Sequence, residues 1–337
     1  MTIMASLPNG VLFRTVPPLP TYVYNRTISV NTSNFNLRND IISSGWDQVS
    51  PLSVSVTINS GIYVWATSVT VAAFDTDVLP AGVNVNIYNN GIIMGCGGNG
   101  GYAGAFSSKG DPGLPGACAL RSYCNVTLVN NGYILGGGGG GGSVNISVSG
   151  AAQTSYCGAG GGGAGGGNGG GVGIGGGGYG GTVAAVGTVG YPSASVSYTV
   201  SSGTNASSAP FACGGGGGRI YNGSAAVTTN VQRLPGWFSR ALGGNGGGAS
   251  GGGGATNNGF LLAGLYYVFN SPGGAVTTAA GGGGGGWGAS GSIANVGGGF
   301  INNGGSYAGG AGGPSIEKHG KTMTISGTGT VSGSILV

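Results

Sequence analysis

Alternating apolar and polar residues mark short β-strands at both ends of the chain. Residues 27–30, 54–58 and 62–65 alternate and are rich in β-branched side chains, as half-buried strands are. Residues 322–326 and 331–335 alternate in the same way, and we expect them to be strands that close the structure. Only residues 37–44 show a helical pattern. The chain is therefore predicted to be mainly β and irregular, with almost no α-helix.

A weak internal repeat adds two further strand pairs. The segment VNIYNNGIIMG at residues 85–95 matches VTLVNNGYILG at residues 126–136, and residues 300–305 form a shorter echo. Each copy passes through Asn-Gly, which between alternating apolar residues is typical of a β-hairpin. We therefore expect each copy to make a β-turn that leads directly into a glycine run.

Glycine divides the chain into unlike parts. The 337 residues include 85 Gly, whereas glycine makes up about 7 % of an average protein. Before residue 95 the glycines are only Gly10, Gly45, Gly61, Gly82 and Gly91. This distribution predicts a β-rich domain at residues 1–94 with an extended N-terminal arm at 1–25, a glycine-rich domain at 95–313, and closing β-strands at 314–337.

Several structures of the glycine runs can be excluded. The runs lie at residues 97–104, 136–142, 158–171, 173–181, 214–218, 243–254, 281–288, 297–299 and 309–313. Collagen requires glycine at every third position only, and a flexible linker would not alternate with apolar segments such as residues 260–269. Gly-x-Gly-x-x-Gly recurs, but no copy lies between a predicted strand and a helix with the acidic partner that a nucleotide site needs.

Packed polyglycine-II helices account for these runs best. A polyproline-II backbone has three residues per turn and no internal hydrogen bonds. Several such segments packed side by side can bond N–H to C=O between neighbours, which satisfies backbone groups that are buried. Only glycine permits so close an approach, because a Cβ would push the backbones apart. We therefore predict a sandwich of polyglycine-II helices with long connecting loops.

Charge and cysteine content exclude several classes of site. Charged residues make up 5 % of the chain, and the net charge of +4 is not clustered, so we expect no nucleic-acid partner. No secretion signal is recognised at the N-terminus, and no apolar run approaches the roughly 18 residues of a membrane span. The five widely spaced cysteines and His319 predict neither a metal site nor a cofactor, although a Cys118–Cys124 bridge is one interpretation.

The acidic residues argue against catalysis. They are Asp40, Asp47, Asp75, Asp77, Asp111 and Glu317. Asp75 and Asp77 could share one face of a strand, and paired carboxylates can cleave glycosides. However, the sequence from Phe74 to Gly82 has the pattern of a solvated loop. We predict that the protein is not an enzyme, with a polysaccharide depolymerase as the weaker alternative.

Glycine runs separated by aromatic-bearing segments resemble the distal tail-fibre adhesins of T-even-type phages. The resemblance spans roughly residues 95–313. It implies a polyglycine-II sandwich, an N-terminal part attached to the tail fibre or another virion protein, and tip loops that bind an outer-membrane protein or a surface glycan of the bacterium. It also implies location at a tail-fibre tip, after assembly in the host cytoplasm. Residues 36–47 are similar to lead-in segments of other phage virion proteins.

The candidate receptor-binding loops are the segments between the runs, at residues 143–157, 182–213, 219–242 and 255–280. Their Tyr, Ser, Asn and Gly content is that of antibody binding loops, in which rigid aromatic side chains anchor the partner. The alternative is that the aromatic side chains cover the faces of the glycine stack, and Trp287 is assigned to packing. If successive helices are antiparallel, residues 182–213 and 255–280 share one end and residues 219–242 lie at the other. The candidate residues are Tyr191, Tyr198, Phe211, Trp237, Phe238, Phe260, Tyr266, Tyr267 and Phe269.

The N-terminal arm is the candidate attachment segment. Proline-rich segments are extended and semi-rigid, so the arm can serve either as a docking element or as a simple linker. The candidate attachment residues are Pro17, Pro18, Pro20 and Tyr22. The predicted function is a receptor-binding adhesin without membrane insertion. The alternative is a structural virion protein, such as a capsid decoration or a fibre cap.

Overall fold

Strands dominate the described part of the chain, as the sequence predicts. The structure is a computed structural model that describes residues 18–102, 111–148, 154–158, 160, 162–167, 208–209, 211–212, 241–242, 278–280, 282, 284–293, 295–297, 305–306 and 308–337. Within these ranges the helix is α1 (Leu37–Ser43), as expected for residues 37–44. It begins at Asn36, whose side chain accepts a hydrogen bond from the Asn39 N–H.

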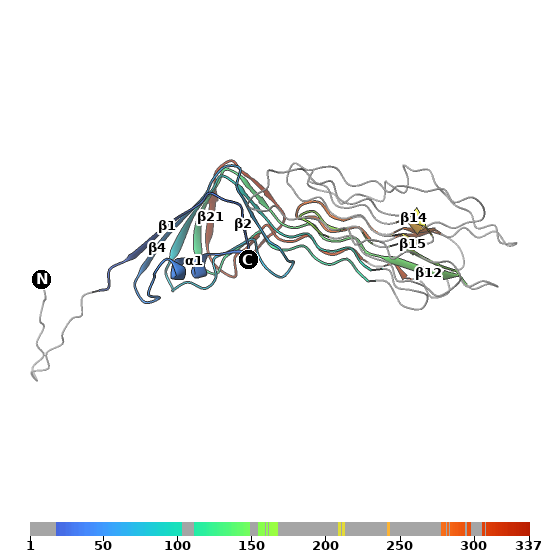
Figure 1. Ribbon diagram of the computed structural model, residues 1–337, viewed down its shortest axis with the longest axis horizontal. Coiled ribbons are helices and arrows are strands. Elements are labelled where there is room, and N and C mark those ends of the chain that lie inside the picture. Colours follow the sequence, from blue (N-terminus) through green and yellow to red (C-terminus); the bar gives the residue numbers. More distant parts are fainter. Residues whose placement is uncertain are drawn as a thin grey trace, which may run out of the picture.

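Three parallel sheets form a β-helix at one end of the molecule (Figure 1). The first sheet has the order β1 (Tyr22–Ile28), β4 (Leu52–Ile58), β7 (Asn84–Asn89), β10 (Asn125–Asn130) and β21 (Met323–Ser326). The second has the order β2 (Thr32–Ser33), β5 (Tyr63–Trp65), β8 (Ile92–Met94), β11 (Tyr133–Leu135) and β22 (Thr330–Ser332). The third has the order β3 (Phe35–Asn36), β6 (Phe74–Asp75), β9 (Leu120–Arg121), β20 (Ile316–Glu317) and β23 (Ile335–Leu336).

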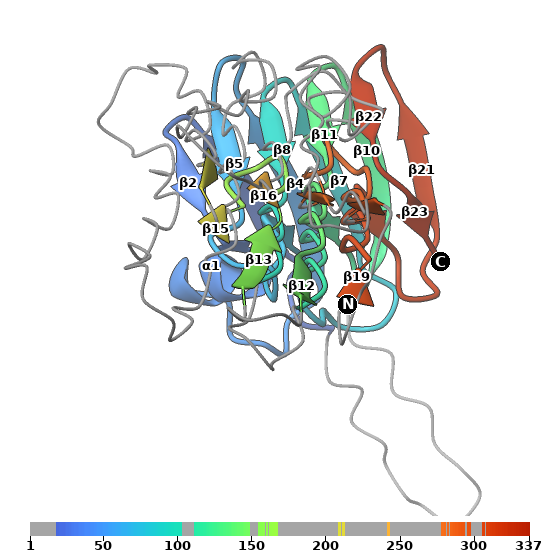
Figure 2. The same ribbon diagram turned by 90° about the vertical axis from the view of Figure 1, so that its right-hand side faces the viewer.

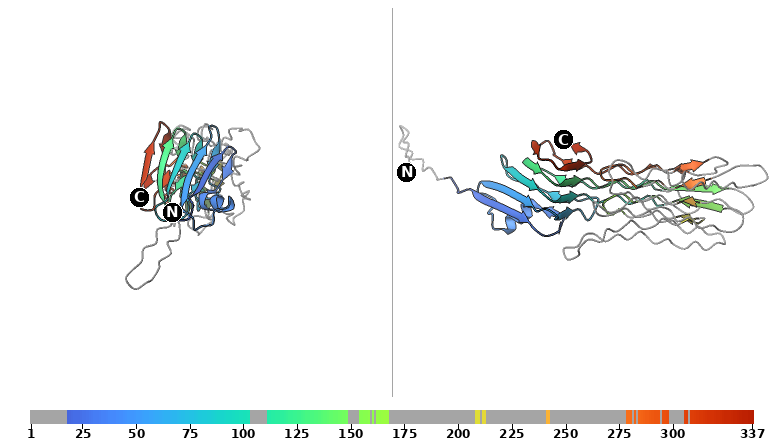
Figure 3. Two further views of the ribbon diagram at one scale, coloured as in Figure 1. Left: turned by 90° about the vertical axis from the view of Figure 1, so that its left-hand side faces the viewer. Right: turned by 90° about the horizontal axis from the view of Figure 1, so that it is seen from above.

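One strand from each sheet makes up what we call a coil. The strands of the first sheet follow one another in sequence order across the molecule (Figure 3). The first coil is β1–β2–β3, the fourth is β10–β11–β20, and the fifth is β21–β22–β23. The predicted C-terminal strands are therefore present, and they pair with coil four. The sequence divisions at residues 94/95 and 313/314 fall inside coils three and four, and the division into domains remains a prediction.

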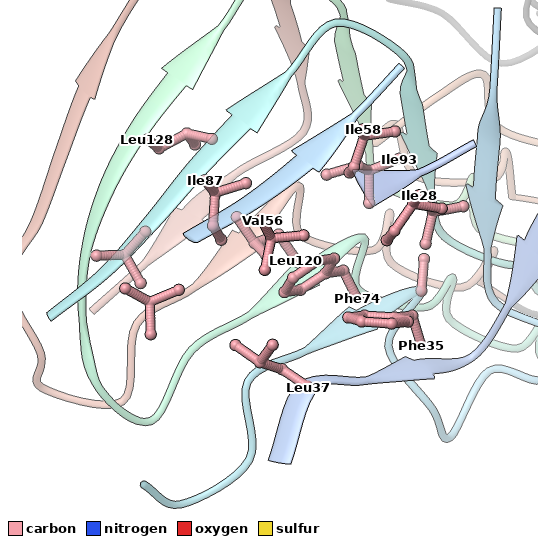
Figure 4. Close-up of a cluster of buried hydrophobic side chains, with 14 of the residues drawn as sticks. Ile28, Phe35, Leu37, Val56, Ile58, Phe74, Ile87, Ile93, Leu120 and Leu128 are labelled. Carbon is pink, nitrogen blue, oxygen red and sulfur yellow. The ribbon is translucent and has the colours of Figure 1, made fainter. Parts of the chain in front are cut away.

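The core of the β-helix is filled by inward-facing aliphatic and aromatic side chains. Val56, Ile87 and Leu128 stack along the first sheet and are fully buried. The rings of Phe35 and Phe74 meet them from the third sheet, with centroids 5.0 Å apart (Figure 4). Alternation along β4, β7 and β10 places these aliphatic residues inside and Ser55, Asn86 and Thr127 on the outer face.

The internal repeat builds two stacked coils rather than two hairpins, so the hairpin prediction is wrong. Val85 pairs with Val126 and Ile92 with Tyr133, in parallel register. The Asn-Gly element is the corner between the first and second sheets. A Cβ on Gly132 would lie 1.9 Å from the Gly91 carbonyl oxygen. Close approach of successive coils therefore requires glycine there, instead of the left-handed backbone of a hairpin turn.

The asparagines of the repeat form a buried ladder at the same corner. The Asn89 Nδ2 donates to Asn130 Oδ1 at 2.7 Å and to the Tyr133 carbonyl at 3.2 Å. The Asn130 Nδ2 donates in turn to the Thr330 carbonyl at 3.3 Å. These hydrogen bonds join coils three, four and five. They also satisfy buried amide groups, which are costly when they are left unpaired.

The glycine-rich part is inserted into two coils. Residues 95–119 connect β8 to β9, and residues 136–315 connect β11 to β20. Both excursions leave the second sheet and return to the third, so their ends are fixed in neighbouring coils. The described segments of the excursions extend away from the β-helix side by side (Figures 1 and 3), and Figure 2 shows them end-on.

Hydrogen bonds within the excursions repeat every third residue, as polyproline-II geometry requires. The N–H groups of Gly137, Gly140 and Ser143 donate to the carbonyls of Ala117, Leu114 and Asp111, at 3.0, 2.9 and 3.2 Å. The N–H groups of Gly136, Gly138, Gly139 and Gly142 donate to the carbonyls of Ser332, Ala164, Ala289 and Ser292. The carbonyls of residues 136–142 accept from N–H groups at Gly98, Gly101, Gly282, Gly285, Gly288, Gly310 and Gly313.

Residues 136–142 are thus the centre of a stack that bonds to neighbours on all sides. This arrangement confirms the predicted packing of polyglycine-II segments for the described residues. A Cβ on Gly140 would lie 1.9 Å from the Asn99 carbonyl oxygen, so the spacing of the segments excludes larger residues there.

A second apolar cluster joins the stack to the β-helix. Trp65, Met94 and Leu135 face outward from the second sheet, and Trp287 and Ala164 cover them. All are buried. Trp287 therefore packs at the junction, as the sequence predicts.

Candidate functional site

Two small sheets lie at the end of the glycine stack remote from the β-helix (Figure 1). One has the order β15 (Phe211–Ala212), β13 (Thr154–Gly158), β12 (Val144–Val148) and β19 (Gly305–Ser306). The other has the order β14 (Ser208–Ala209), β16 (Ala241–Leu242), β17 (Thr278–Ala280) and β18 (Asn295–Gly297). We call this region the distal end.

The distal end gathers the ends of the three long candidate loops. Strands β14 and β15 end the segment 182–213, β16 ends the segment 219–242, and β17 ends the segment 255–280. Ala241 pairs with Ala279 in parallel, and with Ala209 in antiparallel orientation. The last residues of all three segments therefore lie side by side.

The prediction that residues 219–242 lie at the opposite end is wrong for the residues that the structure describes. Strands β16 and β17 are parallel neighbours, so both enter the stack in the same direction. Counting each glycine run as one pass through the stack is what placed these two segments at opposite ends.

Of the predicted receptor-binding residues, Phe211 alone lies in the described ranges. It is in β15, where it pairs with Cys157 of β13. The others lie outside the described residues: Tyr191, Tyr198, Trp237, Phe238, Phe260, Tyr266, Tyr267 and Phe269. The described strands of the distal end contain no charged residue, so the platform that carries these segments is neutral.

The predicted attachment residues lie at the beginning of the β-helix. Pro18 and Pro20 are exposed and precede β1, whereas Pro17 lies outside the described residues. Tyr22 is half-buried, and its hydroxyl donates to the Ser44 carbonyl at 2.7 Å. Its N–H donates to the Pro51 carbonyl at 2.7 Å. Tyr22 therefore fixes the point at which the proline segment leaves the β-helix.

A charge ladder crosses the outer face of the third sheet, and sequence reasoning missed it. Arg121 pairs in register with Asp75 on one side and Glu317 on the other. Its Nε lies 2.7 Å from Glu317 Oε2, and its Nη1 lies 3.6 Å from Asp75 Oδ2. The signal in the sequence is the recurrence of an apolar residue followed by a charged one in β6, β9 and β20.

The two carboxylates considered for catalysis have structural contacts. Burial raises the pKa of Asp75, and the Asp77 N–H and Arg121 act in the opposite direction. The Asp77 N–H donates to Asp75 Oδ1 at 2.8 Å, and Asn36 donates to Asp77 Oδ2 at 3.3 Å. Both acids thus hold the turn after β6.

The described cysteines are buried free thiols, so no bridge joins Cys118 to Cys124. Burial raises the pKa of the Cys124 thiol. Within the described ranges, no His, Cys, Asp and Glu side chains cluster in a way that could hold a metal ion. The described helix is too short to cross a membrane.

Comparison with known proteins places the chain among phage proteins. The family model of the phage tail fibre adhesin Gp38 matches residues 24–336. A crystal structure of the gp37-gp38 adhesin tip complex of the bacteriophage S16 long tail fiber is similar, with 18 % sequence identity and a TM-score of 0.40. That match covers 93 % of this chain and 82 % of the other. No curated protein matches the sequence.

Proposed function

The chain belongs to the phage tail fibre adhesin Gp38 family, and from this premise we propose that it binds a bacterial surface receptor at a fibre tip. The receptor is an outer-membrane protein or a surface glycan. The observation that carries this proposal is that the last strands of the segments 182–213, 219–242 and 255–280 lie side by side at the distal end. Segments that end together on one platform can contact one receptor together.

The platform supports this role because its rigidity does not depend on the loops. Buried backbone hydrogen bonds hold the glycine stack together, so loop residues are free to specialise in recognition. We assign contact with the receptor to Tyr191, Tyr198, Phe211, Trp237, Phe238, Phe260, Tyr266, Tyr267 and Phe269. Large aromatic side chains give much contact area for little loss of conformational freedom.

The β-helix, at the opposite end of the molecule, is the proposed anchor to the fibre. We assign Pro17, Pro18, Pro20 and Tyr22 to a contribution to that contact, and Tyr22 fixes the point at which the proline segment meets the β-helix. The adhesin acts by binding and not by catalysis, and it is assembled onto the fibre in the host cytoplasm.

Binding of the purified protein to host cells tests the receptor proposal. We expect saturable binding that competes with phage infection and is lost on receptor-deficient cells. Alanine variants of Tyr198, Trp237 and Tyr266 should weaken binding separately, while their melting temperatures stay unchanged. Folded protein that does not bind host cells would contradict the proposal and favour a structural virion protein.

A second measurement separates binding from degradation. The protein is incubated with host surface polysaccharide, and released reducing sugar is measured. We expect none above the buffer control, whereas steady release would identify a depolymerase and contradict a binding-only role.

A further inference from the structure

The two ends of the β-helix are covered differently. At the first coil, α1 packs across the inward side of β1. The Tyr24 hydroxyl donates to Asp40 of α1, and Arg26 Nε lies 3.2 Å from the same carboxylate. Inward-facing Tyr24 and Phe35 are buried as a result. The first coil is therefore capped by the protein itself.

The fifth coil has no comparable cap in the described part of the chain. Its inward positions hold Met323, Ile325, Val331 and Ile335, in register with fully or almost fully buried residues of coil four. However, Ile325 is 39 % exposed and Ile335 is 45 % exposed. The apolar interior of the β-helix therefore opens to the surface at this end, which we call the open end.

Backbone groups are also available at the open end. Strands β21, β22 and β23 are edge strands, each paired on one side with coil four. An edge strand offers a row of N–H and C=O groups to a further strand, and end repeats of stacked folds need a polar cap for solubility. Edges and apolar interior together fit a β-structured partner that continues the stack.

Charge around the open end limits the choice of partner. Lys318 and Lys321 lie at the corner that leads into β21, and Lys321 is exposed. Glu317 adjoins Lys318 in sequence, and its carboxylate lies 2.7 Å from Arg121 Nε. A second copy would bring two lysine-bearing ends together, whereas a partner with acidic residues at this corner would be attracted.

We propose that the open end is the docking surface for the tail fibre. A β-structured segment of the fibre protein adds to the edges of β21, β22 and β23 and covers Ile325 and Ile335. Acidic residues of that segment lie near Lys321. The inference rests on the proposed function for the identity of the partner, and it moves the main contact from the proline arm to the opposite end of the β-helix.

Fibre binding by matched variants tests this surface. The probe is a preparation of tail fibres from phage particles grown without this chain. Ile325→Glu and Ile335→Glu place a charge on the open end, and Val30→Glu and Val49→Glu place one near the first coil, where Val30 is 61 % and Val49 73 % exposed. We expect the first pair to weaken fibre binding about tenfold or more, because a charge is then buried without a partner, and the second pair to leave it unchanged.

Two controls keep the outcome interpretable. Host-cell binding of the isolated variants should equal that of the unchanged protein, so a failure of receptor recognition is seen separately. Amide hydrogen exchange of the unchanged protein should slow in residues 323–336 when fibres are added, a measurement that needs no substitution.

Three results would overturn the inference. The first is fibre binding that is unchanged in Ile325→Glu and Ile335→Glu but is lost in Val49→Glu or when Pro18 and Pro20 are replaced. The second is a dimer of the unchanged protein that Ile335→Glu dissociates, which would identify a second copy as the occupant. The third is unchanged hydrogen exchange in residues 323–336 in the fibre complex.

Discussion

Substitution of Gly140 by Ala tests whether the glycine stack depends on backbone contact. The Cβ of alanine would lie 1.9 Å from the Asn99 carbonyl oxygen and 2.4 Å from the Asn99 carbonyl carbon. Restoring an ordinary contact requires the two segments to separate by about 1.5 Å. Both neighbouring atoms belong to backbone, so no side chain can turn away to make room.

The separation disrupts hydrogen bonds on both sides of Gly140. Its N–H donates to Leu114 at 2.9 Å, and its carbonyl accepts from Gly310 at 2.7 Å. Each buried group left without a partner costs about 1–3 kcal/mol. Alanine also lowers the conformational entropy of the unfolded chain, which offsets this loss of stability by about 0.4–1 kcal/mol. We therefore expect a net loss of about 3–5 kcal/mol in the free energy of unfolding.

Thermal unfolding followed by circular dichroism measures this loss. A decrease of that size corresponds to about 4–7 °C in melting temperature for a chain of this length. Gly61→Asn is the matched control, because Gly61 has φ +75° and nothing near its Cβ position, and asparagine tolerates that backbone region. A melting temperature of Gly140→Ala within about 1 °C of the unchanged protein would refute the close-packed stack.

Three further predictions concern the junction, the charge ladder and the loop after α1. Trp287→Ala should lower the free energy of unfolding by about 3–5 kcal/mol, because it leaves a cavity in the buried junction. Trp287→Phe should keep most of the stability of the unchanged protein, since the indole N–H has no hydrogen-bond partner in the described structure. Arg121→Ala should lower the free energy of unfolding in chemical denaturation by about 2–3 kcal/mol, because Asp75 and Glu317 both lose their contact with the guanidinium and Glu317 keeps His319 Nε2 at 3.6 Å. Glu317→Gln in the same chain should recover part of that loss. The pKa of Asp47 is lowered by hydrogen bonds from the N–H groups of Ser50 and Val49 and from the Ser50 hydroxyl. The contribution of the Asp47 carboxylate to the stability of the fold is therefore present above the ordinary carboxyl pKa and is lost as pH falls. The melting temperature should accordingly decrease less between about pH 5 and about pH 3 in Asp47→Asn than in the unchanged protein.

Local features of the fold could be predicted from the sequence because they have local causes. The alternation at residues 54–58 reflects one buried face, and it predicts a strand in whichever sheet the segment joins. The glycine runs predict their own packing, because only a backbone without Cβ can approach another so closely. The helix at residues 37–43 has a capping residue, Asn36, in the sequence itself.

Register between coils could not be predicted in the same way. The Asn-Gly elements at residues 90–91 and 131–132 carry the signal of a hairpin, but their glycines serve contact between coils. That contact depends on β7 lying beside β10, a pairing across 41 residues of sequence. The charge ladder is more distant still, since Arg121 and Glu317 are 196 residues apart.

The insertion of the glycine stack explains how one chain can hold the segments between its glycine runs on a fixed base. Strands β8 and β9 hold the ends of the first excursion, and β11 and β20 hold the ends of the second. Neighbouring coils of one core therefore fix all four points at which glycine segments enter or leave the β-helix. The described part of the stack is bonded backbone to backbone, so its order depends little on side chains. Aromatic residues in the proposed receptor-binding segments can then change without loss of the scaffold, provided that the glycines whose Cβ positions are occupied by backbone remain glycine.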